Sequence, residues 1–158
     1  MRYQDRFSPS FLGCVTKDLR MAKVVERLYH EELESVDFYL YRCVLTQETV
    51  PELFELFEEL AEEEVHHFLI LGRLLRALGG DPSLRFQMRM PHVKSTCEEN
   101  EDRRAQTLLY ESLKGERRAC SFYRALIGYT DDGVIRSVLS YLLEEEMRHE
   151  EKLNRFFG

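Results

Sequence analysis

Four long stretches of the chain repeat apolar residues at spacings of three and four, and in each of them glutamate interrupts the repeat. Near the C-terminus, Val138 and Leu142 follow this spacing. Glu146 and His149 come next in the same phase, and the apolar pattern resumes at Leu153. Because this spacing places residues on one face of an α-helix, a carboxylate and an imidazole occupy positions expected in the protein core.

The same periodicity predicts an all-α fold with four long helices. They are expected over residues 18–45, from Pro51 to the sequence LGGDP, over residues 103–129, and from Asp132 to the C-terminus. Asp18 and Asp132 can cap helix N-termini, and Pro51 suits a first helical turn. Helices of about 27 residues are about 40 Å long and can bury their apolar stripes only against one another. We therefore expect a four-helix bundle over residues 18–158, after an N-terminal segment of residues 1–17.

The bundle is expected to contain two duplicated helical hairpins, residues 18–79 and 103–157, with a long crossover between the second and third helices. Glu32 and Glu116 lie in matching sequences of the form Glu-x-x-small-x-x-x-Tyr. The other polar residues in core phase form two Glu-x-x-His pairs, Glu64 with His67 and Glu146 with His149. The number of residues between these two pairs is nearly the same as the number between Glu32 and Glu116. These matches indicate an internal duplication.

At about 1.5 Å per residue, all four glutamates lie about 20 Å from a bundle end, so they can meet halfway along the bundle.

Four buried glutamates need a counter-charge, because each desolvated carboxylate is costly without a partner. Two divalent cations balance four carboxylates, and protonation of a purely structural network is the alternative. Carboxylate and imidazole ligands suit iron or manganese, whereas structural zinc prefers thiolate-rich sites. We therefore predict a dinuclear metal site, with iron as the expected metal and manganese as the alternative. Its predicted ligands are Glu32, Glu64, His67, Glu116, Glu146 and His149.

The second helix contains a further Glu-x-x-His match, because Glu63 and His66 overlap the pair of Glu64 and His67. The two phases differ by about 100° around the helix, so only one can face the core. The Glu64 phase carries five leucines and a phenylalanine, whereas the Glu63 phase carries charged residues. We therefore expect Glu64 and His67 to face inward, and Glu63 and His66 to face solvent.

The composition excludes several other classes of protein. A net charge of −7 argues against nucleic acid as a partner, since phosphate binding needs clustered Lys and Arg. The first residues, MRYQDRFSPS, have no apolar signal region, and residues 68–75 are too short and too charged to span a membrane. The four cysteines form no C-x-x-C pair and are expected to be buried free thiols. We expect a cytoplasmic protein.

These residues resemble the ferritin-like di-iron carboxylate superfamily, particularly its rubrerythrin and bacterioferritin branches. The resemblance covers about residues 20–157 and includes LGGDP after the second helix. It implies that Glu32 and Glu116 are terminal ligands. It also implies that Glu64 and Glu146 bridge two metals, and that His67 and His149 bind one metal each. Tyr39 and Tyr123 would hydrogen-bond to ligand carboxylates, or alternatively only fill the core.

Departures from the family pattern bear on function. Rubrerythrins carry a further glutamate where this chain has Ala119, and they commonly append a Cys₄ domain. Cage-forming members have a fifth helix, which is not expected here. We expect an oxidoreductase that reduces peroxide or dioxygen, receives electrons from an external donor protein and forms a homodimer. The alternatives are a ferroxidase of the bacterioferritin type, a dimanganese catalase-like enzyme, and a non-catalytic interaction module that keeps its metals for folding.

Overall fold

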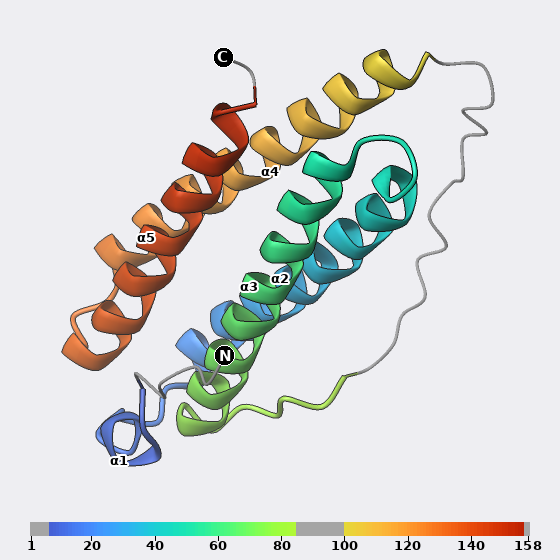
Figure 1. The fold of residues 1–158 in the computed structure, drawn as a ribbon. Helices are drawn as coiled ribbons and strands as arrows, with labels where there is room; N and C mark the ends of the chain where they lie inside the picture. Colours follow the sequence, from blue (N-terminus) through green and yellow to red (C-terminus); the bar gives the residue numbers. More distant parts are fainter. Residues whose placement is uncertain (1–6, 85–99, 157–158) are drawn as a thin grey trace.

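The computed structural model describes residues 7–84 and 100–156, which form an all-α four-helix bundle as predicted (Figure 1). Its helices are α1 (Pro9–Leu12), α2 (Leu19–Thr46), α3 (Pro51–Ala77), α4 (Glu101–Tyr129) and α5 (Gly133–Asn154). Helices α2 and α3 pack as one hairpin, and α4 and α5 pack as a second hairpin beside it. Most of the long crossover, residues 85–99, lies outside the described residues, as does Cys97.

The helix starts follow from capping residues. The Asp18 carboxylate accepts hydrogen bonds from the backbone N–H groups of Arg20 and Met21 at 2.8 and 3.1 Å. Asp132 caps α5 in the same way, and Pro51 opens α3. Helix α4 begins two residues before the predicted start at residue 103, because the Asn100 side chain caps it.

Two glycines end α3 and turn the chain into the crossover. Gly79 has a φ of 92°, a left-handed conformation that side chains disfavour. At Gly80, an added Cβ would lie 2.3 Å from Leu75 Cδ1, so a larger residue would have to displace the Leu75 side chain. The chain is then held by Tyr29, whose hydroxyl donates to the Pro82 carbonyl at 3.0 Å. These contacts direct the crossover away from the end of α3.

The short helix α1 was not predicted. Four residues are too few to show a helical period, although Ser8 caps the helix and Pro9 opens it. The segment packs on α3 at one end of the bundle, and Leu12 and Val15 join the apolar core. Part of the N-terminal segment therefore closes this end of the bundle.

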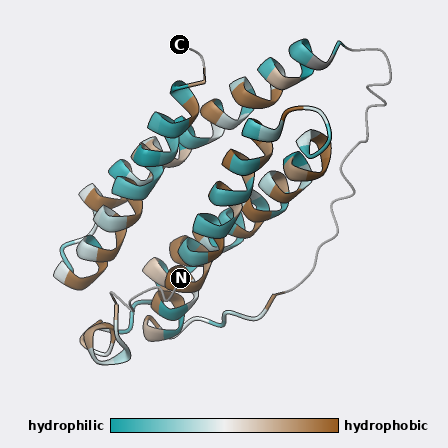
Figure 2. Cartoon of the chain, viewed as in Figure 1, coloured by the Kyte–Doolittle hydropathy of each residue, from teal (hydrophilic) through white to brown (hydrophobic). Residues whose placement is uncertain are grey.

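The apolar core is divided into two clusters along the bundle axis. Each long helix contributes to both clusters, and its core-phase glutamate lies between the two contributions. On α3, for example, Leu60 belongs to one cluster and Leu71 to the other, with Glu64 and His67 between them. Figure 2 shows hydrophobic and hydrophilic residues alternating along each long helix, as expected for amphipathic helices. None of the helices within residues 7–84 and 100–156 combines the length and apolar content needed to cross a bilayer.

Candidate metal centre

The six predicted ligands come from all four long helices. They lie together between the two apolar clusters and form a polar layer there. Each of them is at most 5% exposed. Helix α2 provides Glu32, α3 provides Glu64 and His67, α4 provides Glu116, and α5 provides Glu146 and His149. The heights expected from residue counting therefore agree with the arrangement of the side chains.

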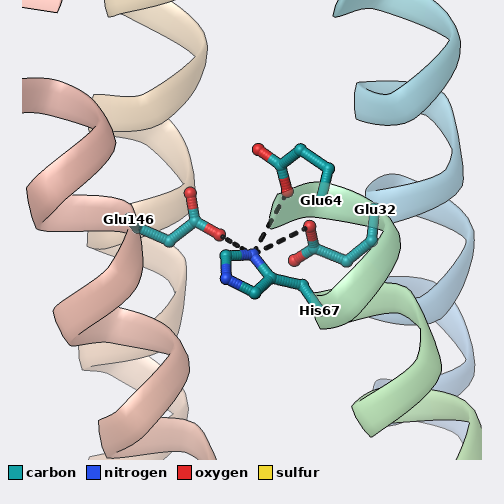
Figure 3. A group of neighbouring side chains, drawn as sticks. All are labelled: Glu32, Glu64, His67 and Glu146. Atoms are coloured by element: carbon teal, nitrogen blue, oxygen red, sulfur yellow. Dashed lines mark hydrogen bonds and ion pairs between the residues drawn. The ribbon is translucent and has the colours of Figure 1, made fainter. Parts of the chain in front are cut away.

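In the first group, three carboxylates converge on one ring nitrogen of His67 (Figure 3). Its Nδ1 atom lies 3.1 Å from Glu146 Oε1, 3.2 Å from Glu64 Oε2 and 3.8 Å from Glu32 Oε2. One nitrogen thus faces three carboxylates that belong to three different helices.

The second group repeats this arrangement around His149. Its Nδ1 atom lies 3.3 Å from Glu64 Oε1, 3.4 Å from Glu116 Oε2 and 3.5 Å from Glu146 Oε2. Glu64 and Glu146 belong to both groups, and each turns one oxygen towards each histidine. The two imidazole rings are nearly parallel, with centroids 5.2 Å apart. This is the arrangement expected of two bridging and two terminal carboxylates.

The donor atoms fit a pair of cations. Within each group, one ligand atom per residue lies within 4.8 Å of all the others. Ligand atoms about 2.1 Å from one shared ion lie about 3 to 4 Å apart, which matches these contacts. Among the described residues, Glu146 Oε1 and His149 Nδ1 are atoms of these groups that are buried without a well-formed hydrogen bond. Buried polar atoms normally have partners, so these two atoms fit a site that holds a cation.

Without metal, the four carboxyl groups form two pairs whose pKa values shift in opposite directions. Burial raises the pKa of Glu32 and of Glu116 well above the usual value, and nearby Glu146 raises both further. For Glu64 and Glu146 burial acts in the same direction, but hydrogen bonds from the two histidines outweigh it and lower each pKa. The terminal carboxyls therefore tend to hold a proton, whereas the bridging carboxyls stay ionised.

The two histidines complete this balance of charge. Burial lowers the pKa of His67 and His149, but hydrogen bonds to the surrounding carboxylates outweigh burial and raise each pKa well above the usual value. Two protonated imidazoles then neutralise two ionised bridging carboxylates. Metal ions that bound here would have to displace the protons of the histidines and of Glu32 and Glu116.

Two buried tyrosines fix the terminal glutamates across the two hairpins. Tyr123 on α4 donates its hydroxyl to Glu32 Oε1, and Tyr39 on α2 donates to Glu116 Oε1. Burial is the main cause that raises the pKa of both phenols, so they remain donors. In each terminal glutamate, Oε1 is held by a tyrosine and Oε2 faces a histidine. The tyrosines thus orient these carboxylates as well as filling the core.

The expected orientation of Glu63 was wrong. Its side chain is only 26% exposed and lies against α5, where Oε2 is 3.1 Å from His149 Nε2 and 2.5 Å from Lys152 Nζ. Burial raises the pKa of Glu63, but hydrogen bonds from His149 and Lys152 outweigh it and lower the pKa to about 2. Helical phase alone did not identify this contact, because it depends on how closely α3 and α5 pack.

A groove of about 670 Å³ between α2 and α4 reaches the candidate centre. Glu32, Glu116 and Glu146 line its inner end, together with the two tyrosines. Small residues line the sides of the groove, among them Ser35 on α2 and Gly115 and Ala119 on α4. The centre is therefore open to small molecules on this side.

No cysteine in the described part of the chain belongs to either group of candidate ligands. Cys43 and Cys120 are free and buried, as expected, whereas Cys14 is free but exposed. The donor set is thus made of oxygen and nitrogen, which suits iron or manganese.

Comparisons with known proteins agree with the fold. A family model described as the ferritin-like domain matches residues 18–158. The search of curated proteins finds no match. Among solved structures, the chain is similar to the bacterioferritin-related protein of Bacteroides fragilis, described as a dodecameric thioferritin. The two share 22% sequence identity and a TM-score of 0.75, over 94% of this chain and 90% of that chain. The structural likeness shows a shared fold, and the family match over residues 18–158 shows that the chain belongs to the ferritin-like family.

Proposed function

We propose that the chain is a dinuclear iron carboxylate protein that reduces peroxide or dioxygen. In this proposal Glu32 and His67 hold one metal, and Glu116 and His149 hold the other. Glu64 and Glu146, which belong to both groups, would be shared by the two metals. The two groups of donors, each within 4.8 Å, support this arrangement.

The groove between α2 and α4 is the observation that favours a reactive centre over a structural one. Structural metal sites are closed by protein ligands, whereas catalytic sites keep an open position. Here the groove leads from the surface to three of the four carboxylates, and its volume lies in the range of ligand pockets, about 300–1,000 Å³. Ala119 lines this groove where rubrerythrins carry a carboxylate, so this chain keeps room there for a small molecule.

Two ferrous ions in this centre would supply one electron each, which with two protons reduce hydrogen peroxide to two molecules of water. The chain orients the terminal carboxylates through Tyr39 and Tyr123, so that one oxygen of each remains available as a ligand. The apolar clusters on both sides of the centre exclude water along the bundle axis, so that access is through the groove. In this proposal an external donor protein returns the electrons.

Stopped-flow spectroscopy tests the proposal. Protein loaded anaerobically with two ferrous ions per chain should be oxidised by hydrogen peroxide, by dioxygen or by both, with an increase in near-ultraviolet absorbance. A structural site would remain silent with both oxidants, and that result would overturn the proposal. Metal analysis of protein purified without added metal decides between iron and the dimanganese alternative.

Iron oxidation linked to storage is the second candidate, favoured by the relative that is described as bacterioferritin-related and dodecameric. Storage needs a closed shell of many copies, whereas we propose a homodimer. Light scattering distinguishes the two, because a dimer has twice the mass of the 18.8 kDa chain and a dodecamer has twelve times that mass. Twelve copies that oxidise many ferrous ions per chain would favour storage over peroxide reduction.

A further inference from the structure

The duplicated hairpins allow each residue on α3 to be compared with its counterpart on α5, once the two Glu-x-x-His pairs are aligned. Glu63 and Glu145 are such a pair, since each directly precedes a bridging glutamate. Their partners differ. Glu63 Oε2 lies 3.1 Å from Nε2 of His149 on the neighbouring hairpin, whereas Glu145 pairs with Arg148 on its own helix.

The contact around Glu63 is extended by Lys152. Its Nζ atom lies 2.5 Å from Glu63 Oε2 and 3.1 Å from Glu59 Oε1, so the lysine joins α5 to α3. The counterpart of Lys152 on α3 is Ile70, which is buried in the apolar core. An isoleucine cannot hold a carboxylate, so the duplication does not provide the same network around the other histidine.

The two histidines therefore differ in their contacts with carboxylates outside the centre. His149 has carboxylates at both nitrogens, because Nδ1 faces the centre and Nε2 faces Glu63. In the described part of the chain, every ion pair of His67 runs from Nδ1 to a carboxylate of the centre itself. A histidine that binds metal through one nitrogen carries its proton on the other, and a carboxylate acceptor there fixes the ring and makes it more basic.

We propose that Glu63, held in place by Lys152, positions His149 and makes the two metal positions unequal. The position formed by Glu116 and His149 binds its metal more tightly than the position formed by Glu32 and His67. The inference rests on the proposed metal centre. It predicts that metal occupies the position of Glu116 and His149 before the position of Glu32 and His67. Glu63 acts through His149 and is a positioning residue.

Anaerobic titration with cobalt(II), followed by calorimetry and visible absorption, tests the inference. The wild-type protein should bind two ions in two resolved steps. In Glu63→Gln, which keeps the size of the side chain, the tighter step should weaken by about ten- to a hundredfold, and the weaker step should stay unchanged. Glu145→Gln is the matched control and should leave both steps as in the wild type. Lys152→Met should weaken the tighter step in the same direction by a smaller factor.

Double-mutant cycles identify which histidine is involved. Glu63→Gln should have no further effect in a His149→Ala background, but its full effect in a His67→Ala background. Wild-type affinities for both ions in Glu63→Gln would overturn the inference. So would an equal loss in both steps, since that is the mark of a general structural role. A wild-type protein that binds no cobalt at all would instead overturn the metal centre itself.

Discussion

Two adjacent histidines on α3 lie in opposite environments. His67 is 1% exposed, and its Nδ1 atom faces three carboxylates. His66 is partly exposed and contacts the ring of Tyr141 on α5, with centroids 6.5 Å apart. One residue along a helix rotates a side chain by about 100°, which accounts for the difference.

This difference predicts opposite results for two alanine variants. His67→Ala removes a proposed ligand and should weaken binding at one metal by roughly tenfold or more, about 1.4 kcal/mol. His66→Ala should leave both affinities within about twofold, because its ring lies outside the centre. Anaerobic calorimetry with ferrous iron measures both. Loss of binding in His66→Ala alone would show that the inward face of α3 has been assigned one residue away from its true position.

The protonation of the centre predicts how the stability of the metal-free protein depends on pH. Glu32, Glu116, His67 and His149 all have pKa values above their unfolded values, near 4.3 and 6.5. The folded state therefore binds more protons than the unfolded state, and the stability that these groups contribute is lost as pH rises from about 5 to 8.

Metal-loaded protein should show the opposite trend, because protons compete with metal for the same ligands. Denaturant unfolding of both forms between about pH 5 and 8 measures this. Replacing His149 with Gln should flatten the slope of the metal-free protein, whereas His30→Gln, outside the centre, should not. A metal-free protein that becomes more stable over this range would contradict the assigned protonation.

At the scale of helices, a glycine on α4, Gly115, lines the groove and leaves open space in it. A Cβ added at Gly115 would meet no atom within 4 Å, so a larger side chain fits without displacing the backbone. Gly115→Leu should preserve or raise stability by about 0.5–1 kcal/mol and leave metal affinity unchanged. It should also slow oxidation by peroxide on the order of tenfold, by filling the groove.

Gly128→Leu is the matched control for this experiment. It lies on the same helix with open space around it but does not line the groove, so its oxidation rate should equal that of the wild type. Stopped-flow rates for both variants test whether the groove is the route to the centre. An unchanged rate in Gly115→Leu would mean that the oxidant enters elsewhere.

The helices differ in how far sequence predicts them. The spacing of apolar residues in α2, α3, α4 and α5 correctly predicted which face of each helix points inward. This works because the direction of a side chain around a helix depends only on its position along the helix. Asp18 and Asp132 marked two helix starts through local hydrogen bonds. The contact of Glu63 with His149 and the width of the groove could not be predicted, because both depend on the distance between helices. Helix α1 was missed because four residues show no period.

In the whole molecule, the candidate centre is where all four long helices meet. Contacts are extensive within each hairpin, and the six candidate ligands add a polar layer that joins the two hairpins between the apolar clusters. A cation shared by carboxylates from both hairpins would hold them together. Metal binding should therefore stabilise the fold as a unit.

Removal of metal should consequently lower the free energy of unfolding. Each occupied site should contribute about 2.7 kcal/mol when free metal is a hundred times its dissociation constant, and this contribution should rise with the logarithm of metal concentration. Denaturant unfolding with redox-inert manganese(II), compared with excess chelator, measures the effect.

Glu64→Gln alters a carboxylate shared by both groups and should abolish most of this gain in stability. Glu62→Gln, on an exposed position of the same helix, should retain it. A free energy of unfolding that does not depend on manganese would contradict the dinuclear centre, because ligands drawn from four helices cannot bind a cation without stabilising the packing that brings them together.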